Sequence, residues 1–599
     1  MSDTAPIIAL MRAGSWPDAE AQLKALLKRN PDDMTALRLL GTVFHLTGRS
    51  KEAIPLLETA THHNPDDVAA ILNLGSANLA EGNLNQARSA FEQASKLEPK
   101  GSDGPFNLGI TELRAGHPDL AAGHFRWAIK CGANRIEALS NLAVAELRAG
   151  DFEAGAAVAS EVLVSNPNLD AVRFVLITAL TELGRVSEAE AALATADPKS
   201  SEAWRYLTLE AELRFRTGCL AEAAMTYRRA IEAGDSRPMT QLQLVRCLKE
   251  SGLAEEAIEV LTQVLVRENA NLEAWTLLAQ AHRELKQYPQ AIDAYDRARE
   301  LAPEATRLDA AQAAVLYMMG EAERGDDLID AAIVRAPQGV APWVTRMERQ
   351  VEQGEVLSAL ATCDDFLTMR PQDFNMLAVK PFLLSALNRD AEAKSLMDTE
   401  RLIFASKLPV PDGYGSLEAF NAVLAEECQN HPSLSHYGAA SKATQNGRQS
   451  GNLFFGDSKA FKTFERLLWS AAEQYLERLP NDAYHPYLSV RPQLGGVHAW
   501  AVVLEHSGHQ SAHIHPTGWL SGVYYPKLPD VMHAGASEDG WIEFGAPPPE
   551  LTIGHTGLSK RIKPEEGLLV LFPSYFYHRT LPYESDDARI SIAFDFTPR

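Results

Sequence analysis

The chain has 599 residues, of which 46% are hydrophobic and 23% are charged, and its formal net charge is -23. This length exceeds what one hydrophobic core supports, so at least two domains are expected. The excess of acidic side chains argues against a general binder of nucleic acid or of anionic membranes, because both would repel it. No window approaches eighteen consecutive apolar residues, so no membrane span is predicted.

The N-terminal segment and the cysteines bear on location. The segment MSDTAPIIALMRAGSW has neither a basic stretch nor a long apolar core, so no secretory signal is expected. The five cysteines are far apart and none lies in a C-x-x-C motif: Cys131, Cys219, Cys247, Cys363 and Cys428. They are interpreted as small buried hydrophobic residues in a reducing compartment, and the predicted location is the cytoplasm.

Prolines recur through the first two thirds of the chain, mostly at intervals of 34 residues or close to its multiples: Pro31, Pro65, Pro99, Pro167, Pro303, Pro337 and Pro371. Within each interval the same small and large positions return. Gly41, Gly75 and Ala279 fall where two helix backbones would approach, and large apolar residues fill the seam between the helices. Each proline then ends the second helix, because it cannot continue the hydrogen-bond ladder.

This pattern resembles the tetratricopeptide repeat. The resemblance implies an all-α superhelix, or solenoid, of about eleven helix pairs over residues 1–405, with irregular registers around 190–240 and after 372. One unit cannot bury its apolar face alone, so stacking is required. Such arms bind a protein or peptide in their concave groove or mediate self-association, so a protein partner and an oligomer are both expectations.

The sequence changes in character after the repeats. Residues 406–415 are rich in proline and glycine and predict a linker, and residues 416–599 form the second domain. Helices are predicted at 416–429 and 458–479. Short strands follow: 487–490, 498–505, 520–525, 541–544, 568–572 and 589–596. Short strands preceded by helices favour a sandwich or barrel, and a jelly roll is one such fold.

Three histidines of this domain are candidate metal ligands. His513 and His515 are two residues apart, so in an extended strand their side chains share one face. His578 follows the buried run 568–572 and a turn that contains proline. Three imidazoles from two separate segments make a plausible metal site.

A candidate anion site follows the last histidine. Arg589 begins the next predicted strand, and antiparallel pairing of neighbouring strands would bring it near His578. Its guanidinium group can hold a carboxylate through two parallel hydrogen bonds. Ser591 lies on the same strand face and adds a hydroxyl donor.

Segments 444–450, 513–525, 572–578 and 589–591 resemble the 2-oxoglutarate-dependent oxygenase superfamily. More closely, they are similar to a bacterial and phage group of 2-oxoglutarate–Fe(II) oxygenases distantly related to prolyl hydroxylases. The resemblance covers roughly 415–599. It implies a double-stranded β-helix (jelly-roll) domain that binds Fe(II), uses 2-oxoglutarate as co-substrate, and forms succinate, CO2 and a hydroxylated product.

The resemblance also assigns roles to residues. It implies that His513 and His578 bind iron. Arg589 would pair with the distal carboxylate of 2-oxoglutarate, with Ser591 and Tyr525 as helpers.

The chain departs from the superfamily pattern at one position. The usual ligands are His-x-Asp or His-x-Glu plus a distal histidine, but here the third residue of that motif is His515. Three interpretations stay open: His515 is a ligand of a three-histidine site, or it is the first histidine of a shell completed by a carboxylate or water, or it belongs to a degenerate binding module. Asp595 is a poor candidate for that carboxylate, because six strand residues place it about 20 Å from Arg589.

The leading functional hypothesis is an Fe(II)- and 2-oxoglutarate-dependent dioxygenase that hydroxylates a protein or peptide recruited by the repeat arm. One alternative is a small-molecule oxygenase whose repeats serve assembly. Another is a non-catalytic protein-binding adaptor. No nucleic-acid or membrane partner is expected.

Overall fold

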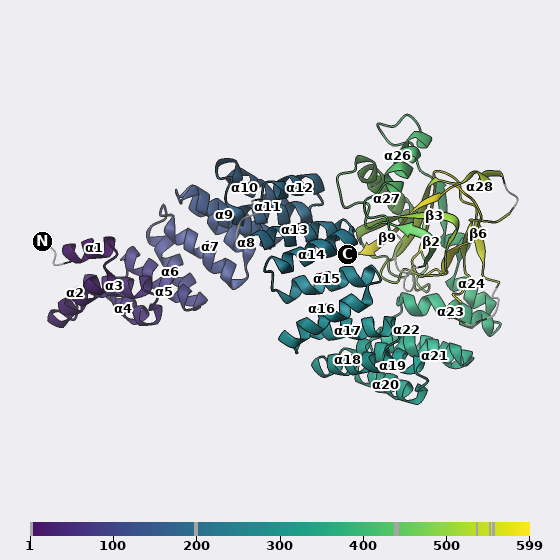
Figure 1. The fold of residues 1–599 in the computed structure, drawn as a ribbon, viewed down its shortest axis with the longest axis horizontal. Helices are drawn as coiled ribbons and strands as arrows, with labels where there is room; N and C mark the ends of the chain where they lie inside the picture. The colour runs from purple at the N-terminus through teal and green to yellow at the C-terminus, as the bar shows by residue number, and fades with distance from the viewer. Residues whose placement is uncertain are drawn as a thin grey trace. The chain divides into compact units, whose positions relative to one another are not determined.

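The computed structural model describes residues 4–196, 202–435, 443–534, 537–549, 551, 553 and 557–599. The chain divides into two compact units, Met1–Asp197 and Pro198–Arg599. The first unit is built of helices, and the second begins with helices and ends in a strand-rich region (Figure 1). No helix among the described residues is long and apolar enough to cross a membrane.

Paired helices form the first unit and the first half of the second. The helices of the first unit are α1 (Ala5–Arg12), α2 (Trp16–Arg29), α3 (Met34–Leu46), α4 (Ser50–His63), α5 (Val68–Ala80), α6 (Leu84–Leu97), α7 (Asp103–Ala115), α8 (Pro118–Lys130), α9 (Arg135–Ala149), α10 (Phe152–Ser165), α11 (Asp170–Glu182) and α12 (Val186–Ala194).

The paired helices of the second unit are α13 (Ala203–Arg216), α14 (Leu220–Glu232), α15 (Pro238–Glu250), α16 (Ala254–Arg267), α17 (Leu272–Glu284), α18 (Tyr288–Leu301), α19 (Thr306–Met318), α20 (Ala322–Arg335), α21 (Val340–Glu352), α22 (Val356–Met369), α23 (Phe374–Ala386) and α24 (Asp390–Leu396). Each odd-numbered helix packs on the next one, which gives twelve consecutive pairs where the sequence predicted about eleven. The repeat fold is confirmed.

Small residues stand where two helices approach closely, as the repeat pattern predicted. A Cβ atom on Gly75 would lie 2.6 Å from the ring of Phe91, and one on Gly109 would lie 2.6 Å from the ring of Phe125. Contacts this short are not tolerated, so any larger residue would push the two helices of the repeat apart.

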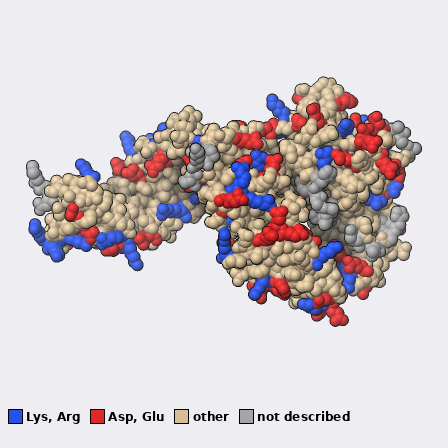
Figure 2. All heavy atoms as spheres, viewed as in Figure 1, with Lys and Arg blue, Asp and Glu red and all other residues tan. Residues whose placement is uncertain are grey.

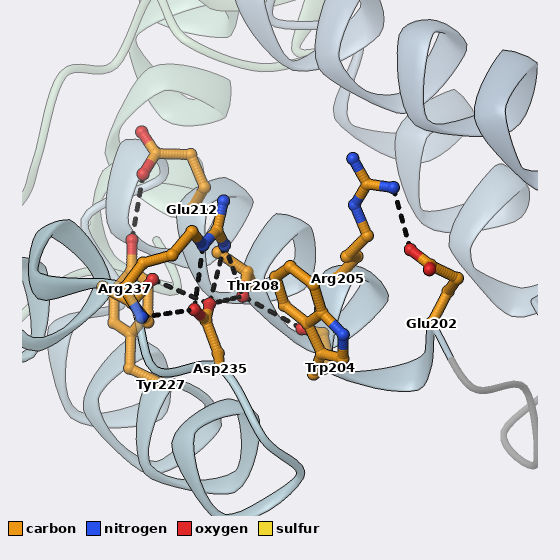
Figure 3. Close-up of polar contacts among 9 residues, drawn as sticks. Glu202, Trp204, Arg205, Thr208, Glu212, Tyr227, Asp235 and Arg237 are labelled. Carbon is orange, nitrogen blue, oxygen red and sulfur yellow. Dashed lines mark hydrogen bonds and ion pairs between the residues drawn. The ribbon is translucent and has the colours of Figure 1, made fainter. Parts of the chain in front are cut away.

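A buried carboxylate braces the first repeats of the second unit (Figure 3). Asp235 is 1% exposed and accepts hydrogen bonds from Thr208, Arg237 and Thr240. The Arg237 guanidinium group also lies 4.7 Å from the ring centre of Trp204. Burial raises the pKa of Asp235, but these hydrogen bonds outweigh burial and lower the pKa to about 2. The carboxylate therefore joins α13 to α15.

We expect Asp235→Asn to destabilise the second unit by about 2 to 3 kcal/mol near neutral pH, because the pKa is lowered from 3.8 to about 2 and one pKa unit corresponds to about 1.4 kcal/mol. A lowered pKa stabilises the folded state above the ordinary value of 3.8, and this contribution is lost as the pH falls towards about 2. Thermal midpoints of wild type and variant should thus differ at pH 6 and converge near pH 2. An equal difference at both pH values would contradict this account.

Two antiparallel sheets make up the C-terminal region. The strands are β1 (Phe404–Lys407), β2 (Thr444–Gln449), β3 (Leu494–Gln510), β4 (Leu520–Lys527), β5 (Ile542–Phe544), β6 (Lys560–Ile562), β7 (Leu568–Pro573), β8 (His578–Thr580) and β9 (Arg589–Pro598). The larger sheet has the order β1-β7-β4-β9-β3-β2, and the smaller has the order β6-β5-β8. This is the predicted jelly roll, a double-stranded β-helix.

Four further helices accompany these sheets: α25 (Thr399–Leu402), α26 (Leu417–Gln429), α27 (Lys459–Arg478) and α28 (Asp530–Ala534). The predicted helices at 416–429 and 458–479 correspond to α26 and α27. The ring of Trp469 in α27 packs 5.0 Å from Phe596, and Phe464 packs 5.1 Å from Tyr524. The apolar stripe of α27 therefore covers the larger sheet.

Two details of the predicted second domain are wrong. Residues 487–490 form a turn rather than a strand, because the buried ring of Tyr487 stacks on Trp519 at 4.3 Å instead of joining a ladder. The predicted linker at 406–415 begins inside β1, where Lys407 pairs with Leu568 of β7. Leu408 N then donates to a backbone carbonyl of the turn before β7. The sheet therefore starts before the proline-rich run.

The last repeats share one hydrophobic core with the jelly roll. The ring of Phe374 in α23 lies 5.4 Å from Tyr575, and the ring of Phe382 lies 5.7 Å from Tyr577. Tyr575 and Tyr577 lie in the turn between β7 and β8. The hydroxyl of Tyr575 also donates to the carbonyl of Leu396, at the end of α24. Helix α23 is therefore part of the support of the strand-rich region.

We expect a fragment of residues 416–599 to be far less stable than a fragment of residues 202–599. The shorter fragment lacks β1 and α23, and losing two buried phenylalanines alone costs about 3 kcal/mol each. Thermal unfolding followed by circular dichroism compares the two fragments, which share the same C-terminus. Cooperative unfolding of both at one temperature would contradict the shared core.

Candidate metal centre

Backbone pairing places two of the predicted histidines side by side. His513 and His578 form an isolated antiparallel bridge in which each backbone N donates to the carbonyl of the other at 3.1 Å. His515 N donates to Ser574 O at 3.0 Å. Segment 513–515 therefore runs along the edge of the smaller sheet beside β8.

The three imidazoles converge. One ring nitrogen from each of His513, His515 and His578 lies within 4.8 Å of the others. Among the described residues this is the group of histidine, cysteine or acidic side chains whose geometry suits a metal ion. The sequence predicted that His513 and His515 share one face and that His578 comes from a distant strand. The structure brings the three side chains together.

Two of the imidazoles are oriented by backbone acceptors at Nδ1. The acceptor is Ser511 O for His513 at 2.7 Å and Phe576 O for His578 at 3.0 Å. Because carbonyl oxygens only accept, Nδ1 carries the proton in both rings. Nε2 then keeps its lone pair, which is the arrangement of histidines that bind metals.

Burial keeps the same two rings neutral. It lowers the pKa of His513 to about 4, and the neighbouring His515 acts in the same direction. Burial also holds the pKa of His578 well below its usual range, with further lowering by the two other histidines. Neutral imidazoles offer the lone pairs that a metal ion needs.

Aromatic rings lie against two of the three histidines, His515 and His578. The indole of Trp500 stacks on His515 with ring centres 5.5 Å apart, and Phe572 lies 4.7 Å from His578. Phe544 adds a contact at 6.2 Å to His578. These rings restrict water access and limit rotation of the imidazoles.

A second polar site lies inside the same jelly roll. Arg589 is 1% exposed, its guanidinium group lies 5.0 Å from the ring centre of Tyr525, and its Nη1 donates to Ser591 Oγ at 3.3 Å. Arg589 Nε and the Tyr525 hydroxyl have no hydrogen-bond partner among the described residues. Burial raises the pKa of Tyr525 to about 12, so the hydroxyl keeps its proton.

An anion would complete this second site. No carboxylate of the described part of the chain forms an ion pair with Arg589. A buried guanidinium group without a counter-ion is costly, whereas a bound carboxylate would satisfy Arg589 and Tyr525 together. The residues at the two sites therefore fit a divalent metal ion and a carboxylate ligand.

The predicted adjacency of the strands that carry His578 and Arg589 is wrong. Strand β8 pairs with β5 in the smaller sheet, whereas β9 lies between β3 and β4 in the larger one. The chain crosses from one sheet to the other between these two residues. His578 therefore belongs to the smaller sheet and Arg589 to the larger one.

Sequence reasoning missed the partner of His515. The sequence alone presents Asp595 only as a candidate direct ligand. In the structure its Oδ2 lies 2.6 Å from His515 Nδ1, and its Oδ1 accepts a hydrogen bond from Ser521 at 2.6 Å. The ladder of β4 and β9 pairs Ser521 with Asp595. Only that register reveals the contact, and nothing in the local sequence indicates it.

Comparison with known families agrees with the two parts of the fold. Residues 498–595 match the family described as "Putative 2OG-Fe(II) oxygenase", and this range includes the histidines, Arg589 and Asp595. Tetratricopeptide-repeat families match residues 7–61, 44–104, 106–170 and 272–304. The chain carries tetratricopeptide repeats in its N-terminal region and a domain of that oxygenase family near its C-terminus. No curated protein matches the chain.

Solved structures similar to this chain include several tetratricopeptide-repeat proteins. One from Parabacteroides merdae is 15% identical over 41% of this chain and 97% of its own length, with a TM-score of 0.32. A thermophilic one from Thermus thermophilus is 23% identical over 29% of this chain and 95% of its own, with a TM-score of 0.25. The MamA protein is 22% identical over 27% and 87%, also with a TM-score of 0.25.

We expect the purified chain to bind one Co(II) ion, a stable probe for a divalent site. Separate substitutions His513→Ala, His515→Ala and His578→Ala should each weaken binding by at least about a hundredfold, because each removes one of three converging donors. Competition against a coloured chelator measures the affinity.

His509→Ala is the matched control, since His509 lies on β3 outside the group of three. It should leave the affinity unchanged. A His515→Ala variant that binds as tightly as wild type would remove His515 from the set of ligands.

Proposed function

We propose that this chain is an Fe(II)- and 2-oxoglutarate-dependent dioxygenase that hydroxylates a protein or peptide. The observation that carries the proposal is the pairing, within one jelly roll, of two sites that each suit a ligand. Three histidines converge as metal donors, and the buried Arg589 and Tyr525 suit an anion. The family match of residues 498–595 supports the oxygenase class.

In this proposal His513, His515 and His578 hold Fe(II) through Nε2. Their Nδ1 atoms stay bonded to the protein, so no ring has to reorient when the ion arrives. Trp500 and Phe572 keep bulk water away from the rings they contact.

Arg589 binds the distal carboxylate of 2-oxoglutarate. Its guanidinium group donates charge-assisted hydrogen bonds, and the hydroxyls of Ser591 and Tyr525 are the nearest further donors. Because Tyr525 remains protonated at neutral pH, it can donate to an anion without repelling it.

When bound, Fe(II) and 2-oxoglutarate supply the oxidising chemistry. Reduction of O2 takes two electrons from the co-substrate, which leaves as succinate and CO2, and two from a substrate C–H bond, which becomes C–OH. The residues of the chain orient the reactants and exclude water from them.

The repeats divide into two groups in this proposal. Those of the second unit are held against the jelly roll: a Cβ atom on Gly218 would lie 2.8 Å from Ser433 Cβ, and the Arg216 guanidinium group lies 5.3 Å from the ring centre of Phe455. This self-packing favours a supporting role for them. It is also the observation that favours the alternative, a small-molecule oxygenase.

Substrate recruitment is therefore assigned to the first unit. Helices α10, α11 and α12 line a groove of about 570 Å³. Its lining combines alanine and leucine side chains, such as Ala156 and Leu176, with charged side chains: Glu153, Arg173, Arg185 and Glu188. On the face drawn in Figure 2, acidic and basic side chains are interspersed among the described residues without a continuous basic stripe. A protein or peptide partner suits such a surface better than nucleic acid does.

We expect wild type to form succinate slowly when Fe(II), 2-oxoglutarate and O2 are supplied without prime substrate. Arg589→Ala should weaken 2-oxoglutarate binding by about a hundredfold, because it removes charge-assisted hydrogen bonds worth about 1.5–3 kcal/mol each. Anaerobic calorimetric titration of 2-oxoglutarate into the Fe(II)-loaded chain gives the affinity, and succinate assay gives the turnover.

Arg466→Ala serves as the matched control, because Arg466 lies on α27 and its hydrogen bond is to Thr463 of the same helix. It should bind and turn over 2-oxoglutarate as wild type does. Absence of both Fe(II) and 2-oxoglutarate binding in wild type would refute the enzyme and leave a protein-binding adaptor.

A further inference from the structure

One of the three histidines, His515, is hydrogen-bonded to a carboxylate. Asp595 Oδ2 accepts from His515 Nδ1 at 2.6 Å, whereas the Nδ1 atoms of His513 and His578 donate to backbone carbonyl oxygens. His515 is thus the ring of this group whose partner carries a full negative charge. It is also the ring that stands where related oxygenases have a carboxylate ligand.

The fold holds Asp595 in a single position. In the larger sheet Asp595 is paired with Ser521 on one side and with His498 on the other. Ser521 Oγ donates to Asp595 Oδ1 at 2.6 Å and lies 2.8 Å from Ser574 Oγ. Because Ser521 has one hydroxyl proton, Ser574 donates to Ser521, and the chain of hydrogen bonds points at the carboxylate.

The turn after His515 packs closely against Asp595 and Ser574. A Cβ atom on Gly518 would lie 2.8 Å from Ser574 Oγ and 3.3 Å from Asp595 Cβ. Gly518 N donates to His515 O at 3.0 Å and so closes the turn. A residue with a side chain at 518 would press on Ser574 and displace the turn that carries His515.

The net charge of the metal ion with its ligands indicates a role for the Asp595 carboxylate. A divalent ion with three neutral imidazoles keeps a charge of +2, whereas two histidines and one carboxylate reduce it to +1. The negative charge of Asp595 restores a net charge of +1 at the metal site, with the ring of His515 between the carboxylate and the ion. Its hydrogen bond also makes His515 Nε2 a stronger donor to a metal ion.

We propose that Asp595 is a positioning residue that fixes His515 in its metal-binding tautomer and supplies the negative charge that three neutral histidines lack. The inference rests on the proposed metal site and deepens it. It accounts for the absence of a carboxylate ligand at position 515. The carboxylate is supplied by Asp595 on β9, which is hydrogen-bonded to His515 rather than bound to the metal.

The test uses the full chain with Co(II) as probe, so that affinity and the visible spectrum of the ion are read without turnover. Asp595→Asn keeps an acceptor for Nδ1 but removes the charge. It should weaken Co(II) binding about 10- to 100-fold and shift the absorption bands. Asp595→Ala should weaken binding more, and Ser521→Ala, which leaves the charge in place, should weaken it less.

A double-mutant cycle separates positioning from a general effect on folding. If Asp595 acts through His515, Asp595→Asn should change Co(II) affinity little in a His515→Ala background, measured at higher Co(II) concentration. The thermal midpoints of the metal-free single variants indicate whether the domain is intact. Additive losses in the cycle would overturn the inference, because Asp595 would then act independently of His515.

The remaining outcomes distinguish the two proposals. If wild type binds Co(II) and Asp595→Asn binds it with the same affinity and spectrum, the metal site stands and the role of Asp595 is refuted. If wild type binds no Co(II), the metal site and the inference are refuted together.

Discussion

The candidate site depends on one pair of backbone hydrogen bonds, between His513 and His578. The two histidines are 65 positions apart in the sequence, and the bridge makes them direct neighbours at a sheet edge. The same ladder places His515 beside Ser574, so all three rings converge. Once the backbone is fixed, nearby carbonyl oxygens select the tautomer of His513 and His578. Ring spacing and protonation therefore have a common origin in strand pairing.

That pairing is supported by residues outside the jelly roll. His578 directly follows an aromatic turn, whose Tyr575 and Tyr577 pack on Phe374 and Phe382 of α23. The last repeats and the jelly roll consequently form one core rather than two domains joined by a linker. The repeats of the second unit contribute to the geometry of the histidines. The proposed recruitment of a partner is therefore assigned to the repeats of the first unit.

Local patterns of the sequence predicted much of the fold and part of the site. The 34-residue spacing indicated the repeats, and the i, i+2 spacing of His513 and His515 needed only strand geometry. Long-range pairing could not be predicted in the same way. Strand β8 belongs to the smaller sheet because it pairs with β5. The contact between Asp595 and His515 depends on the register of β9 against β4. Strands β6 and β8, with three residues each, carry no periodic pattern long enough to detect.

Strand β9 connects the two proposed ligand sites. Alternation along the strand puts Arg589, Ser591 and Asp595 on one face, with the small Ala593 between the two ends. The Cα atoms of Arg589 and Asp595 are about 20 Å apart. Only a long side chain at position 589 can bring a charged group closer to the Asp595 end of the strand. The contact of Arg589 with Ser591 shows that this side chain extends along the strand towards Asp595. Because β3 and β4 pair with β9 on its two sides, the sheet fixes the separation of Arg589 and Asp595 along the strand.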